Sequence, residues 1–62
     1  MERELVIRVD GQGVDDDAGS IVVYRLGDQV SLVATAEKSG DAEVILDKAA
    51  AIALAEALRK LL

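Results

Sequence analysis

The segment that most constrains this fold runs from Asp47 to Leu62 and predicts an amphipathic helix. It contains no Gly or Pro and is rich in Ala, which loses no side-chain entropy on entering a helix. Asp47 predicts the N-cap, because a carboxylate there accepts hydrogen bonds from free N–H groups of the first turn. A rotation of about 100° per residue then gathers one apolar stripe, called here the helix stripe. Its members are Ala51, Leu54, Ala55, Leu58, Leu61 and Leu62.

The last two members of the stripe, Leu61 and Leu62, have two interpretations. They complete the hydrophobic core of their own chain, or they reach a second subunit. Both remain open at the level of sequence.

The length and composition leave few ways to stabilise the fold. A chain of 62 residues makes one domain, predicted here over residues 1–62. Such a domain buries about 60% of its unfolded surface and is marginally stable alone. There is no Cys and no His, so a disulfide and the commonest metal ligands are not available, and we expect no metal and no cofactor. Ideal local structure or self-association is therefore the expected source of stability.

The charge balance limits the classes of partner that the chain is expected to bind. Twelve acidic and seven basic residues give a net charge of −5, which disfavours binding to nucleic acid or to an anionic membrane. The sequence holds no apolar run of the length that spans a bilayer, and its acidic start does not resemble a signal peptide. The expected location is the cytoplasm.

The rest of the sequence predicts strands. Alternating or β-branched runs lie at Glu4 to Val9, Ile21 to Leu26, Gln29 to Glu37 and Asp41 to Leu46. The predicted fold is therefore an α+β domain of order β-β-β-β-α, with a four-stranded antiparallel sheet and one C-terminal helix packed on one face. The position of the first strand in the sheet stays open, because a long segment follows it.

Two predicted turns set the pairing of the strands. Gly27 and Asp28 predict a two-residue type II′ turn, with Tyr24 then opposite Ser31. Residues 38–40, Lys-Ser-Gly, predict a three-residue turn, with Ala34 then opposite Val44. These registers keep the two faces of the sheet consistent across its strands.

Residues 10–20 predict a flexible acidic loop, because they contain three Gly and four Asp. The consecutive acids Asp15, Asp16 and Asp17 do not have the alternating spacing of a calcium loop. Three interpretations are weighed for them: a solvated loop, a weak cation site, and an acidic element that docks on a basic protein.

The strand pattern separates two faces of the sheet. Face A is apolar and is expected to lie under the helix; it consists of Leu5, Ile7, Val9, Ile21, Val23, Val30, Leu32, Ala34, Ala36, Val44 and Leu46. Face B is half polar; it consists of Val6, Arg8, Val22, Tyr24, Leu26, Gln29, Ser31, Val33, Thr35, Glu43 and Ile45. One helix cannot cover both faces. The apolar residues left on face B have three explanations: β-propensity alone, a homodimer interface, or a surface for another molecule.

The predicted interface joins the apolar part of face B with the helix end, in a homodimer. It consists of Val22, Tyr24, Leu26, Val33, Ile45, Leu61 and Leu62. A homodimer is favoured because it supplies the stability that so short a chain lacks.

The residues do not predict an enzyme. Ser20, Ser31 and Ser39 have no His to activate them, and no glycine-rich phosphate loop precedes a helix. The order of four strands and a helix resembles the dimeric PC4-type fold that binds single-stranded DNA. That resemblance implies a basic groove with aromatic platforms, whereas Tyr24 is the sole aromatic residue here.

The sequence thus favours a non-catalytic homodimer that acts as a protein-interaction or regulatory module. Two alternatives are kept. One is a PC4-like single-strand binder, and the other is an acidic inhibitor that docks on a basic protein surface.

Overall fold

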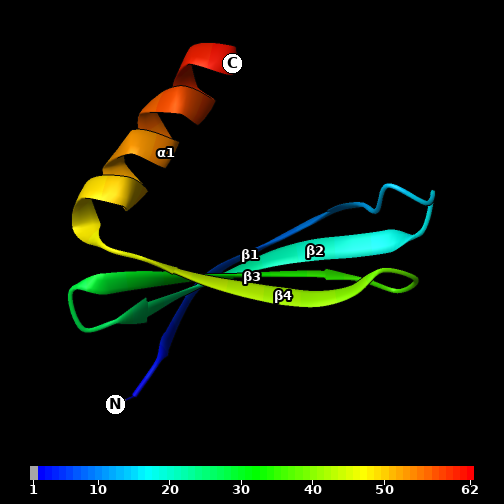
Figure 1. Cartoon of the computed structure of the whole chain (residues 1–62), viewed down its shortest axis with the longest axis horizontal. Helices are drawn as coiled ribbons and strands as arrows, with labels where there is room; N and C mark the ends of the chain where they lie inside the picture. The colour runs from blue at the N-terminus through cyan, green and yellow to red at the C-terminus, as the bar shows by residue number, and fades with distance from the viewer. Residues whose placement is uncertain (1) are drawn as a thin grey trace.

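The computed structural model describes residues 2–62 and shows an α+β fold, as the sequence predicts (Figure 1). Four antiparallel strands form a single sheet in the order β1-β2-β3-β4. The elements are β1 Glu4–Gln12, β2 Ala18–Leu26, β3 Gln29–Ala36, β4 Gly40–Leu46 and α1 Lys48–Leu61. The first strand, whose position was open, is therefore an outer strand beside β2.

The observed pairing of β2 with β3 confirms the register predicted for this hairpin. Gly27 has a φ of 62°, which suits the first central position of a type II′ turn. Leu26 lies opposite Gln29, and Tyr24 lies opposite Ser31. Since side chains alternate along a strand, this register also fixes which residues of β2 and β3 share a face.

The predicted register between β3 and β4 is wrong by two residues. Ala34 lies opposite Ala42 rather than Val44, and Ala36 lies opposite Gly40. Gly40 has a φ of 86° and is already the first residue of β4. The residue in the left-handed conformation is therefore paired with β3 rather than part of an unpaired turn. A shift of two residues preserves the side-chain alternation, and the two faces of β4 are as predicted.

The predicted loop over residues 10–20 is also wrong, because β1 and β2 extend into it. Their pairing continues to Gln12 opposite Ala18, which leaves a turn of only five residues. Within it, Gly13 N–H donates to Asp17 O at 2.8 Å and Asp16 N–H donates to Gly13 O at 3.1 Å. Asp16 takes a φ of 64°, a conformation that Asp tolerates better than most residues. The small and acidic residues therefore make a long hairpin.

Asp17 ties this turn to the turn between β3 and β4. Its side chain is buried, and Oδ2 accepts a hydrogen bond of 2.6 Å from Lys38 N–H. We expect Asp17→Ala to lower the free energy of unfolding by about 1–3 kcal/mol, because the Lys38 N–H loses its acceptor. Urea denaturation measures this change. Asp15→Ala is the control, since Asp15 is exposed; equal losses in both variants would contradict the role of Asp17.

The register of β1 shifts between Leu5 and Ile7. Ile7 lies opposite Val23 on face A, but Leu5 lies opposite Tyr24, on face B. The assignment of Leu5 to face A is therefore wrong. An irregularity of this kind inserts an extra residue into one strand and reverses the alternation beyond it.

The helix begins as predicted, since Asp47 Oδ1 accepts from Ala50 N–H at 2.8 Å. Its course differs from the prediction. It touches the sheet at β3 and β4, then rises steeply away from it on the face A side (Figure 1). Ala51 is half-buried and the remaining residues of α1 are exposed. The helix therefore does not cover face A of its own chain.

Candidate functional site

Face A and the helix stripe together present an extended apolar surface that is exposed in the single chain. Among residues 2–62, Leu26 is the one large hydrophobic side chain that is buried. On face A, Val44 is 55% exposed, and Ile7, Val9 and Ile21 are similar. On the stripe, Leu58 is 52% and Leu61 81% exposed. An exposed apolar patch of this extent is typical of a surface that binds another molecule.

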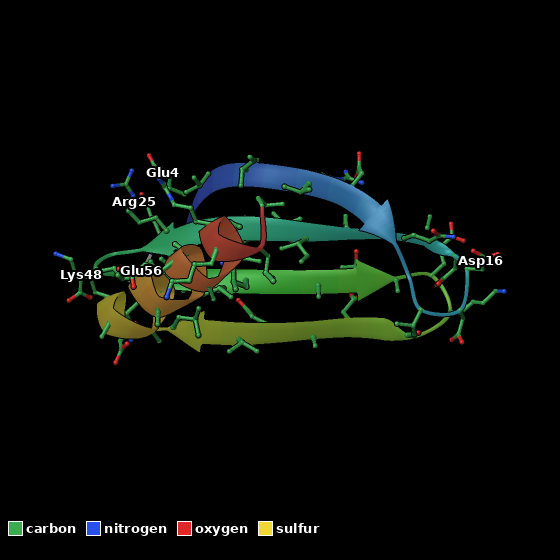
Figure 2. All side chains as sticks on the ribbon, turned by 90° about the horizontal axis from the view of Figure 1, so that it is seen from above. Glu4, Asp16, Arg25, Lys48 and Glu56 are labelled. Atoms are coloured by element: carbon green, nitrogen blue, oxygen red, sulfur yellow. The ribbon has the colours of Figure 1, made fainter. Side chains whose placement is uncertain are left out.

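The two ends of the sheet differ. Figure 2 shows Asp16 at one end, called here the tip end, and Glu4, Arg25 and Lys48 at the other, called the helix end. The helix starts at the helix end. The turns that join β1 to β2 and β3 to β4 both lie at the tip end.

Face A is hollowed at the tip end. An open cavity of about 480 Å³ is lined there by small and apolar residues, among them Val9, Gly11, Gly19, Ile21, Ala34 and Ala42. A Cβ on Gly19 would lie 3.0 Å from the carbonyl oxygen of Thr35, so this position admits only Gly without a shift. A Cβ on Gly11 would meet nothing within 4 Å, because it would project into open space. Asp10 and Asp41 also contribute to the lining of this cavity, called here the hollow, although the strand register places their side chains on face B.

Face B carries a network of polar groups that bind one another within the chain. The guanidinium of Arg3 lies 4.8 Å from the centre of the Tyr24 ring and donates to Glu43 Oε2 at 3.0 Å. The Ser31 hydroxyl, which is fully buried, donates to the same carboxylate oxygen. This network joins residues of β2, β3 and β4 on face B and covers part of Tyr24. The sequence pattern did not predict it, because Arg3 precedes the first strand and reaches face B only in the folded sheet.

The Ser31 hydrogen bond, helped by Arg3 and opposed by desolvation, holds the pKa of Glu43 below its ordinary value of 4.5. A carboxyl whose pKa falls on folding stabilises the fold above its unfolded pKa, and this contribution is lost as the pH falls through the folded pKa. We therefore expect Glu43→Gln to be less stable than wild type at neutral pH and equally stable well below pH 4.5. Urea denaturation across this pH range measures both. A stability gap that does not change with pH would rule out the charge as its cause.

The structure does not bring the predicted interface residues together. Leu26 is buried, and Val22, Tyr24 and Val33 are half-buried on face B, where Ile45 is 52% exposed. Leu61 and Leu62 are exposed at the end of α1, which stands on the opposite side of the sheet. The seven residues therefore form two separate surfaces, and a face B interface remains a prediction.

The predicted acidic docking loop is reduced to two residues. Asp17 is buried in the turn, so its carboxylate does not face a partner. Asp16 accepts a hydrogen bond from the Gln12 amide, and Asp15 lies 3.4 Å from the Ser39 hydroxyl. Only Asp15 and Asp16 are exposed.

Three of the basic side chains on the sheet are engaged with acids of the same chain. Arg3 pairs with Glu43, Arg8 with Asp10 at 3.1 Å, and Arg25 with Glu4 at 2.6 Å. Each pair lies at the surface and contributes little to stability. The pairs do reduce the positive charge that a phosphate backbone would meet on this sheet.

The remaining observations do not add a second site. Within residues 2–62, no helix has the length and apolar character needed to cross a bilayer, and no group of acidic side chains is arranged to hold a metal ion. Comparisons with protein families, with curated proteins and with solved structures each returned no match. The apolar surface of face A and α1 is thus the feature on which a functional interpretation rests.

Proposed function

We propose that this protein is a non-catalytic homodimeric module whose interface is face A together with the helix stripe. In such a dimer face B points outward and carries the interaction with a partner or the regulatory contact. The residue inventory supports a non-catalytic role, since the sequence contains no His and no Cys.

The exposed area of the single chain carries this proposal. The chain exposes 4990 Å². A folded monomer of its mass, 6.5 kDa, is expected to expose about 3,800 Å². The excess of roughly 1,200 Å² exceeds the ~800 Å² per partner that a standard stable interface buries. A second copy would bring the exposed area per chain to the value of an ordinary small domain.

The contrast between the two faces supports face A as the buried one. Face A of the sheet is apolar from β1 to β4, apart from the ion pair of Arg25 with Glu4 at the helix end (Figure 2). Face B holds the Arg3, Ser31 and Glu43 network and a hydroxyl pair, Ser20 and Thr35, at 2.9 Å. Burying face B would remove the charged groups of Arg3 and Glu43 from the water that still reaches them, which costs free energy unless each finds a partner.

Thermal unfolding at different protein concentrations tests the proposal. If folding and association are coupled, the Tm rises with protein concentration, because mass action favours the dimer. A Tm that does not depend on concentration over the micromolar range would contradict a dimer that supplies the core.

Titration with a single-stranded oligonucleotide at low salt tests the PC4-like alternative. Binding to phosphates is strongest at low salt, so the absence of a fluorescence-polarisation change there rejects that function. The acidic-inhibitor alternative now depends on Asp15 and Asp16. It fails if neutralising both leaves capture of a basic partner unchanged.

A further inference from the structure

We propose that the two subunits exchange their helices, so that the last turns of α1 from one copy dock in the hollow of face A of the other. This inference rests on the proposed homodimer and specifies what occupies the hollow. The occupant is the end of the helix stripe, with Leu58, Leu61 and Leu62 as the docking side chains. The same contact is made twice, as a symmetric dimer requires.

The direction of α1 favours contact of its last turns with a second copy. The helix touches its own sheet near its start and rises from it, so its last turns are the part farthest from the sheet (Figure 1). Its 14 residues span about 21 Å, whereas a helix packed on a sheet lies about 10 Å from it. A second sheet that faces this chain would therefore meet the last turns of α1 first. The increase in exposure along the stripe, from 38% at Leu54 to 81% at Leu61, agrees with this direction.

The shape of the hollow suits the leucine side chains at the end of a helix. Its lining is rich in Gly and Ala residues, which let a helix approach the backbone closely, and the space above Gly11 is open. The helix of the same chain begins at the helix end of the sheet, so the hollow at the tip end is left uncovered (Figure 2). Leucine side chains at the end of a helix have the size and apolar character to fill such a space.

The charges agree with this placement. The last turn of α1 carries Arg59 and Lys60. Residues 48–61 carry three basic and one acidic side chain, in a chain whose net charge is −5. The rest of the molecule therefore holds the acidic excess. A helix end that carries two basic residues is attracted to the acidic remainder of a second copy, and its leucines match the apolar residues that line the hollow.

A cross-link between two different variants tests this placement, and the absence of Cys makes single-cysteine variants unambiguous. Leu61→Cys and Ala34→Cys chains are unfolded together, refolded as a mixture and treated with a short bis-maleimide. Mass spectrometry then detects the mixed adduct, whose mass differs from that of either self-adduct. Ile52→Cys mixed with Ala34→Cys is the matched control, because Ile52 is exposed on the other side of the same helix. We expect the mixed adduct for position 61 and at least a tenfold smaller yield for position 52.

Sedimentation equilibrium of the same mixtures before cross-linking separates the possible failures. A dimer that gives no 61–34 adduct overturns helix exchange and leaves the homodimer standing. A monomer overturns both. A chain carrying both cysteines that cross-links only within itself shows that α1 folds onto its own face A, and this result also overturns the exchange.

Discussion

Val44→Glu is expected to dissociate the proposed homodimer. Val44 is 55% exposed in the single chain and lies opposite Leu32 on face A, so the proposed interface buries it completely. A carboxylate placed there would lose its water without gaining a partner. Truncation at the centre of an interface costs about 2–4 kcal/mol, which corresponds to a dissociation constant weaker by about 30- to 1,000-fold. Sedimentation velocity over a concentration series measures this change.

The next residue in the chain supplies the control. Ile45 is 52% exposed and lies on the same strand, but its side chain points to face B. Ile45→Glu introduces the same charge at the neighbouring position of the same strand, but on the opposite face. We expect it to leave the dissociation constant within about threefold of wild type. The opposite result, with Ile45→Glu dissociating the dimer and Val44→Glu having no effect, would place the interface on face B.

The second large effect is expected on the helix. Leu58 is 52% exposed at the centre of the helix stripe. Leu58→Glu should weaken the dimer by about 2–4 kcal/mol and lower the Tm, because the stripe loses its central apolar anchor. Glu is a good helix former, so α1 itself should persist. Circular dichroism and light scattering together distinguish loss of the helix from loss of the dimer.

Ile52→Glu is the matched control for the helix. Ile52 is 48% exposed and lies about 120° around the helix from Leu58, beside Lys48 and Arg59 rather than in the stripe. We expect this variant to keep the mass of the wild type. If both variants associate as the wild type does, the helix takes no part in the interface.

Local patterns were sufficient to predict the elements and one hairpin. Asp47 was predicted as the N-cap because its chemistry is local, and the structure confirms it. The Gly27-Asp28 turn fixed the β2–β3 register, because a two-residue turn leaves no freedom in the pairing. The α+β order follows from these elements.

Features that depend on contacts between distant segments were predicted incorrectly or missed. The glycines and aspartates of residues 10–20 suggested a loop, whereas Asp17 is buried by its contact with Lys38, 21 residues away. The turn after β3 allowed two registers with the same side-chain alternation, and local pattern does not choose between them. The amphipathic pattern of α1 predicts an apolar stripe but not which surface covers it, and in the structure the stripe is exposed. For the same reason the sequence directed attention to face B, while the exposed area directs it to face A.

Sedimentation equilibrium of the wild-type protein at micromolar concentration distinguishes the proposed homodimer from a monomer. We expect a single species with twice the 6.5 kDa mass of the chain, because the proposed dimer buries face A and the helix stripe. A species of 6.5 kDa that stays cooperatively folded at these concentrations would contradict it.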